Sequence, residues 1–119
     1  MRRVVPATEE MIRRFYGAPS AKSWRALAVV DGDEVLGIGG IYLDGPRWVL
    51  FSNMREDVQA SLKKYRRELL RVCWALLGIA SRKKLPVQAL ADPEIVGSDR
   101  LLAHLGFVHI DRGVWQWRG

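Results

Sequence analysis

The strongest constraint on the fold is a long helical pattern over residues 56–84 that separates two apolar, strand-like segments. Along it, seven apolar side chains recur at intervals of three and four residues: Val58, Leu62, Tyr65, Leu69, Val72, Leu76 and Ala80. This spacing places them on one face of an amphipathic helix. The flanking segments are 47–52 (RWVLFS) and 86–91 (PVQALA). Because a long helical crossover favours parallel pairing, the strands around Val49 and Val87 are predicted to pair in parallel.

The segments before this crossover read as a strand, a helix and three further strands. A strand at 2–7 precedes a helix at 9–17, which Thr8 can cap. Residues 25–52 then form a run of three strands, and their two Asp-Gly turns are typical of successive antiparallel hairpins. Within this run the GIGG stretch, 37–40, is followed by strand and turn, so we expect a bulge or close backbone packing there.

The chain ends with a short amphipathic helix that runs into a Leu-Gly-Phe turn, the stretch 97–107, and with two short strands at 107–112 and 114–117. The full order is β-α-βββ-α-β-α-ββ, without a repeat or linker. The sequence therefore predicts a single domain over residues 1–119. Its class is α+β, with a mixed, mostly antiparallel sheet flanked by helices.

The composition narrows the function classes. The chain has 119 residues and a formal net charge of +6, which favours attraction to nucleic acid, phosphate or anionic surfaces without defining a site. No apolar run approaches the roughly 20 residues of a membrane span, and the start MRRVVPATEE lacks an apolar signal core. The single cysteine, Cys73, is expected to be a buried, inert thiol. We therefore expect a cytoplasmic protein without membrane partners.

The element order and the closing HLGF, residues 104–107, resemble the fold of the Gcn5-related N-acetyltransferases, the GNAT family. The strand EVLGIGGIYL, 34–43, is similar to the third GNAT strand, which often carries glycine. The resemblance covers nearly the whole chain. It implies an acyl-CoA-dependent N-acyltransferase with acetyl-CoA as cofactor.

A narrower resemblance is to small GNAT-like proteins encoded in the virion gene modules of tailed bacteriophages. It is carried by GIGGIYL (37–43), by Trp48 at the next strand, by KKYRREL (63–69) and by HLGF (104–107). It implies a phage-derived protein with a virion or assembly role, located in the host cytoplasm or the virion. The implied partners are phage structural proteins or further copies of the chain.

One family motif is missing from the cofactor region. GNAT enzymes bind the pyrophosphate of acetyl-CoA in a glycine-containing turn between the fourth strand and the long helix, and here SLKKYRREL (61–69) stands in its place. This stretch fits an uninterrupted helix, so we expect acetyl-CoA to bind poorly, if at all. Four basic residues of this stretch either bind the phosphates of acetyl-CoA by side-chain charge or form a solvated helix face. They are Lys63, Lys64, Arg66 and Arg67.

The catalytic groups of the family are also missing. In the family a backbone N–H from a bulge in the fourth strand binds the acetyl carbonyl, which implies the backbone of Phe51, Ser52 and Asn53 as that site. The tyrosine that acts as general acid in the family corresponds here to Leu102, and the strand 47–52 carries no glutamate to act as base. We therefore predict weak or lost transferase activity. The alternative is an active N-acetyltransferase that acts on a small amine or a protein amine.

The remaining candidates are weaker. His104 lies two residues from Leu102, about 200° around the helix, and His109 lies in the next strand, so neither takes over the catalytic role. The histidines and the cysteine lack the spacing of metal ligands. Trp115 and Trp117 share a strand face and are either core or a stacking platform for bases. A basic domain that binds nucleic acid weakly and without sequence preference is therefore the third functional hypothesis.

Overall fold

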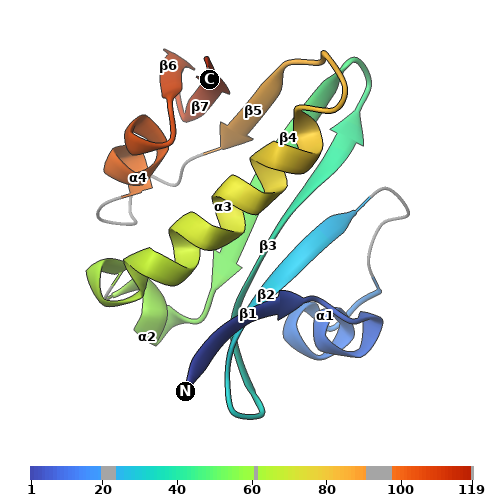
Figure 1. Cartoon of the computed structure of the whole chain (residues 1–119), viewed down its shortest axis with the longest axis vertical. Coiled ribbons are helices and arrows are strands. Elements are labelled where there is room, and N and C mark those ends of the chain that lie inside the picture. The colour runs from blue at the N-terminus through green and yellow to red at the C-terminus, as the bar shows by residue number, and fades with distance from the viewer. Residues whose placement is uncertain (20–23, 61, 91–97, 119) are drawn as a thin grey trace.

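The computed structural model, described for residues 1–19, 24–60, 62–90 and 98–118, contains a seven-stranded sheet with helices on both faces (Figure 1). The elements in chain order are β1 (Arg2–Pro6), α1 (Glu9–Tyr16), β2 (Arg25–Asp31), β3 (Glu34–Asp44), β4 (Arg47–Met54), α2 (Glu56–Gln59), η1 (Leu62–Tyr65), α3 (Arg66–Ala80), β5 (Val87–Leu90), α4 (Ser98–His104), β6 (Phe107–Asp111) and β7 (Val114–Trp117). The predicted order and α+β class are confirmed.

The strands are arranged in the order β1-β2-β3-β4-β5-β7-β6. Only the β4–β5 pair is parallel, with Trp48 opposite Val87 and Val49 opposite Gln88, as the long crossover predicted. The other described pairs are antiparallel. The two predicted Asp-Gly turns join β2 to β3 and β3 to β4. The sheet is therefore mixed and mostly antiparallel, as expected.

Helix α1 covers one face of the sheet. The Thr8 hydroxyl accepts a hydrogen bond from the Met11 N–H (3.2 Å), and Gly17 ends the helix in the left-handed region at φ 75°. Ile12 of α1 packs with three buried residues of the sheet: Ala28, Val30 and Ile38. The caps are those that the sequence predicted.

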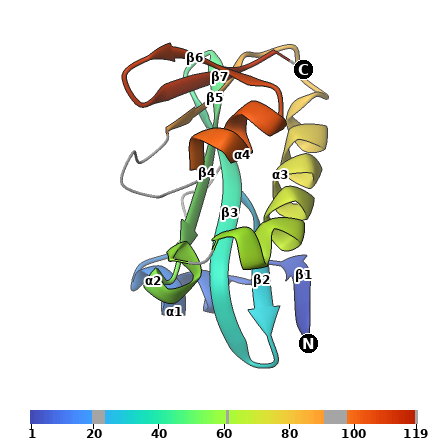
Figure 2. The ribbon, with the colours of Figure 1, turned by 90° about the vertical axis from the view of Figure 1, so that its left-hand side faces the viewer.

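Helices α3 and α4 cover the opposite face, and Figure 2 shows α3 and α1 on opposite sides of the sheet. The predicted apolar stripe is buried at five positions: Val58, Leu69, Val72, Leu76 and Ala80. Tyr65 is half-buried, and the side chain of Leu62 lies outside the described part of the chain. The main core therefore forms between α3 and the sheet.

The uninterrupted helix predicted over 56–84 is wrong. The segment consists of the short helix α2, the 3-10 helix η1, and α3, which begins only at Arg66. Two side-chain-to-backbone hydrogen bonds, one local and one tertiary, lie at this interrupted stretch. Gln59 Nε2 donates to the Met54 carbonyl (2.8 Å), and Arg2 Nη1 donates to the Lys64 carbonyl (3.2 Å). Tertiary contacts thus outweigh the helix propensity of the stretch.

The glycines of the GIGG stretch permit close packing, as predicted. A Cβ at Gly39 would lie 2.7 Å from Val72 Cγ1 of α3, and one at Gly40 would lie 2.6 Å from Phe51 Cζ on the other face. The register between β2 and β3 also shifts next to this stretch. Gly39 therefore allows α3 to pack closely on β3. No described helix has the length and apolar character needed to cross a membrane.

Candidate functional site

The edge of β4 that faces β3, called here the closed edge, is fully paired. β4 pairs with β3 from Arg47 to Met54 in one unbroken register, and just beyond it the Arg55 N–H donates to the Leu36 carbonyl (3.0 Å). The bulge that the family resemblance implied for this strand is therefore absent from its pairing with β3. A regular ladder of this kind leaves the backbone groups on the β3 side bonded.

Along the edge of β4 that faces β5, called here the open edge, the pairing with the described residues of β5 ends before β4 does. The Trp48 N–H donates to the Pro86 carbonyl (2.8 Å) at the start of the parallel pair, and the recorded pairing ends at Leu50 opposite Ala89. Backbone N–H groups alternate between the two edges of a strand. Ser52 lies four residues after Trp48, so its N–H points to the β5 side, beyond the last pair. In the part of the chain that the structure describes, this N–H takes part in no β4–β5 pair, which leaves it as a hydrogen-bond donor for a ligand.

The three predicted carbonyl-binding residues fall on different sides of β4. By the same alternation, the N–H groups of Phe51 and Asn53 point toward β3, and only that of Ser52 points toward the open edge. The side chains of Phe51 and Asn53 lie on the α1 face. There, Asn53 Nδ2 donates to the Tyr16 hydroxyl (2.8 Å), and the Phe51 ring lies 4.6 Å from that of Trp24. Which of these residues offers its N–H at the open edge depends on the alternation of hydrogen bonds along β4. This alternation can be assigned only once the strand register is known.

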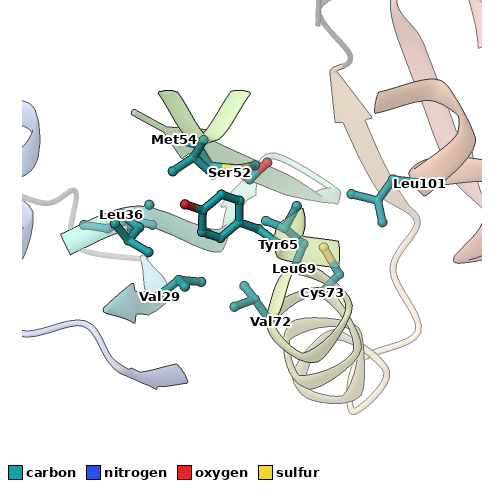
Figure 3. Close-up of a pocket in the computed structure, with 13 residues that line it drawn as sticks. Val29, Leu36, Ser52, Met54, Tyr65, Leu69, Val72, Cys73 and Leu101 are labelled. Atoms are coloured by element: carbon teal, nitrogen blue, oxygen red, sulfur yellow. The ribbon is translucent and has the colours of Figure 1, made fainter. Parts of the chain in front are cut away.

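An apolar pocket lies beneath this part of β4. It is formed between the sheet, α2, η1, α3 and α4, and Figure 3 shows the Tyr65 ring among side chains of β4, β3 and α3. Residues that line it include Ser52, Met54, Tyr65, Leu69, Cys73 and Leu101. Burial raises the pKa of the Cys73 thiol to about 12, so the thiol is neutral and unreactive, as predicted for this residue.

The predicted basic residues gather at the start of α3, next to the pocket. Lys63, Lys64, Arg66 and Arg67 are exposed, and none forms an ion pair with a described residue. Tyr65 is the N-cap residue of α3 and makes no side-chain capping hydrogen bond. Lys64 Nζ lies 5.7 Å from the centre of the Tyr65 ring. The positive end of the helix dipole and four exposed cations therefore coincide, which favours an anion at this position.

Sequence reasoning missed the residue that organises this corner, Arg2. Its guanidinium carbon lies 4.7 Å from the centre of the Tyr65 ring, and its Nε lies 3.2 Å from Glu68 Oε1. Arg2 also donates to the Lys64 carbonyl, as described above. Because 62 residues separate Arg2 from Lys64, no local sequence pattern could have revealed the contact.

The described residues supply few acid–base groups to the pocket. Its lining contains no carboxylate and no histidine, and only Tyr65 and Cys73 could titrate. Leu102, in the position of the family's general acid, is buried in the core at 9% exposure. His104 is exposed at the end of α4. His109 is exposed on β6, with its ring 5.0 Å from that of Trp115.

The other candidates from the sequence have structural roles. Trp117 Nε1 donates to the Leu105 carbonyl (2.9 Å), and Trp115 and Trp117 both pack against the main core, which confirms the core interpretation. Glu34, which the sequence analysis did not single out, begins β3, is exposed and pairs with Arg55 at 3.1 Å. Among the described residues, no group of three or more histidines, cysteines or carboxylates is placed to hold a metal ion.

In its fold the chain is similar to solved structures of acetyltransferases. One is the ribosomal-protein-S18-alanine N-acetyltransferase of Escherichia coli, with 10% identity over 98% of this chain and 93% of that chain and a TM-score of 0.66. Another is a GNAT-family acetyltransferase of Staphylococcus aureus, with 9% identity over 98% of both chains and a TM-score of 0.62.

A third is the N-acetyltransferase-like YhhK of Escherichia coli, solved bound to coenzyme A, with 16% identity over 100% of this chain and 99% of that chain and a TM-score of 0.52. At the level of sequence, no family model and no curated protein matches the chain. The structural likenesses confirm the predicted GNAT fold.

Proposed function

We propose that this GNAT-fold protein binds the thioester of an acyl-CoA at the open end of β4. The observation that carries the proposal is the Ser52 N–H, which points past the last β4–β5 pair beside an apolar pocket. A preorganised backbone donor next to apolar walls suits a thioester carbonyl with an apolar acyl group, because it needs no side chain and little reorganisation.

The start of α3 supports binding of the cofactor's phosphates. The break places the positive end of α3 at Arg66, in the stretch between the fourth strand and the long helix where GNAT proteins bind pyrophosphate. Lys64, Arg66 and Arg67 replace the missing glycine turn with side-chain charge. The helix start supports phosphate binding as the interpretation of the basic stretch, over a solvated helix face. The long side chains must be ordered on binding, which lowers the affinity.

The same site supports little or no acyl transfer. Leu102 cannot protonate a departing thiolate, and the described lining offers no carboxylate to take the proton of an amine. Each missing acid or base typically costs 10²–10⁴-fold in rate. We therefore propose cofactor binding with weak or lost N-acetyltransferase activity, in place of an efficient enzyme.

The proposed binding of acetyl-CoA is tested by calorimetry and by thermal unfolding with this ligand. Ligand at about 100 times its dissociation constant stabilises the fold by about 2.7 kcal/mol, so we expect a clear rise in melting temperature. The double variant Arg66→Gln with Arg67→Gln should lose most of this rise. Arg13→Gln with Arg14→Gln, exposed on α1, makes the same change in net charge and should keep it. Absence of any rise at millimolar acetyl-CoA would refute the proposal.

The proposed loss of acyl transfer is tested by measuring the release of free CoA from acetyl-CoA in the presence of a polyamine or a peptide amine. We expect release at the rate of spontaneous thioester hydrolysis, or slightly above it. Turnover at a typical enzyme rate of about 10 s⁻¹ would show that transfer is retained and that unassigned groups supply the proton transfers.

A second candidate is an assembly role in a phage particle, as the resemblance to phage GNAT-like proteins implies. It is favoured by β6, an outer strand of the sheet that exposes Val108 (46%) and Ile110 (45%). An open strand edge with apolar side chains favours pairing with another chain. Val108→Lys with Ile110→Lys should abolish self-association in sedimentation experiments. A monomer at all concentrations, and absence from purified particles, would argue against this role.

A further inference from the structure

We propose that the outer face of α3 binds single-stranded nucleic acid, at a surface that shares only Arg67 with the proposed acyl-CoA site. The surface, named here the α3 outer stripe, consists of Arg67, Arg71, Trp74 and Gly78, all of them exposed. At 3.6 residues per turn, these positions fall within about 60° of the helix circumference. In Figure 1, α3 lies across the near side of the sheet with no described element over it.

Charge on α3 is sorted by face. The helix carries one acidic residue, Glu68, whose side chain is only 12% exposed and is paired with Arg2. Arg67 and Arg71 face outward and form no ion pair with a described residue. Arg67 also lies in the first turn of the helix, where the helix dipole disfavours positive charge. The positive charge of the stripe therefore has no ion-pair partner among the described residues, which favours binding of an anion.

Trp74 gives the stripe an aromatic surface. It is 49% exposed, whereas Trp48 is 6% exposed and Trp115 and Trp117 pack against the core. The next residue along the stripe, Gly78, has no packing reason to be glycine, because an added Cβ would meet nothing within 4 Å. Glycine weakens a helix interior relative to alanine. Here it leaves the helix surface beside the indole open to a flat ring.

Cations lie on both sides of this aromatic surface. Arg67 and Arg71 precede Trp74, and Arg82, Lys83 and Lys84 are exposed just after the helix. The distance from Arg67 to Arg82 is about 22 Å along the helix axis, enough to follow several phosphates of one strand. Cations that track the backbone, with an aromatic ring for a base, are the chemistry of single-strand binding.

The geometry favours a single strand over other anionic partners. An indole lying on a helix surface can stack only on a base whose face is free, and the bases of a duplex are already stacked. Insertion into a membrane requires several neighbouring apolar side chains, and the stripe has one. We therefore expect binding without sequence preference, because the described stripe contains no side-chain amide or carboxylate to read base edges.

The test is fluorescence anisotropy with a labelled oligothymidine of about 20 nucleotides, measured between about 50 and 200 mM salt. Arg71→Gln should lower the slope of log affinity against log salt by about 0.7, the value for one phosphate on a single strand. Trp74→Ala should weaken binding about tenfold or more with an unchanged slope, and Trp74→Phe should keep most of the affinity. Arg14→Gln, on α1, is the charge-matched control.

The outcomes separate the proposals. Neither Arg71 nor Trp74 lines the pocket, so both variants should bind acetyl-CoA as the wild type does, whether or not the acyl-CoA proposal holds. Retained circular dichroism and melting temperature verify that Trp74→Ala folds. The proposal is overturned if the wild type does not bind at about 50 mM salt, or if Trp74→Ala and Arg71→Gln behave like Arg14→Gln. Equal affinity for a duplex, or preference for anionic lipid vesicles, also overturns it.

Discussion

The two edges of β4 differ in how they are built and in what they leave free. Toward β3, the strand is paired from Arg47 to Met54 without a shift in register. Toward β5, the recorded pairing ends at Leu50, although β4 continues to Met54. Among the described residues, β4 is thus paired on both edges at its start and only on the β3 side at its end.

The difference follows from how each neighbour is connected. β3 and β4 are joined by a tight turn at Gly45 (φ 60°), so their register is set locally. β4 and β5 are joined through α2, η1 and α3, and β5 is only four residues long. A local hairpin pairs fully, whereas a long crossover can leave a gap between its strands. The proposed ligand site lies at this gap.

The largest expected effect is on the free energy of unfolding, and it comes from the core above the closed edge of β4. Leu76 is 1% exposed and packs over Gly39 of β3, so Leu76→Ala should lower the free energy of unfolding by about 2–5 kcal/mol. Leu69 lines the pocket near the open edge, so Leu69→Ala should fall toward the lower end of that range. Chemical denaturation of both variants measures the difference. A larger loss for Leu69→Ala would mean that the pocket is fully packed in solution.

The next prediction concerns backbone protection in β4. The Ser52 amide should exchange with deuterium at least a hundredfold faster than the amides of Phe51 and Asn53, because only those two point toward β3. Hydrogen exchange followed by nuclear magnetic resonance resolves the three amides. Acetyl-CoA should slow the exchange of Ser52 selectively. Equal protection of all three amides would mean that the open edge is covered.

The sequence predicted most of the fold because its signals were local. Thr8 and Gly17 bound the first helix, Asp-Gly turns mark the hairpins, and the three- and four-residue spacing identifies the buried face of α3. The parallel pair followed from the length of the crossover. Each of these inferences depends on residues close together in the chain, where physical preference and sequence pattern coincide.

The candidate site was harder to predict from the sequence, because it depends on contacts between residues far apart in the chain. Which amide of Phe51, Ser52 and Asn53 is free depends on strand register, which the sequence does not display. At the break before α3, Arg2, a residue far away in the chain, donates a hydrogen bond to the Lys64 carbonyl. Helix propensity alone predicted a continuous helix, because it takes no account of such a distant contact.

A third prediction tests whether the pocket under the open edge is dry. Burial raises the pKa of Cys73 from its ordinary 9.0 to about 12, so above pH 9 the unfolded chain releases a proton that the folded chain retains. The stability from this group is complete below pH 9. It should fall by about 1.4 kcal/mol per pH unit as the pH rises toward 12.

Comparison with Cys73→Ala isolates this contribution, because other groups titrate in both proteins. Stability against denaturant from pH 8 to pH 11 should fall more steeply for the wild type. Parallel curves would mean that water reaches the thiol through the gap between β4 and β5.

The smallest expected effects come from two glycines that lie in opposite surroundings. Gly39 is closed in, since a Cβ there would lie 2.7 Å from Val72 Cγ1, whereas a Cβ at Gly78 would meet no atom within 4 Å. Gly39→Ala should therefore destabilise the fold by about 1–3 kcal/mol, because a branched side chain and α3 must shift. Gly78→Ala should stabilise it by about 0.5–1 kcal/mol through helix propensity. Thermal unfolding of the two single variants gives both signs. If Gly39→Ala proved neutral, α3 would not rest on β3 as closely as the structure shows.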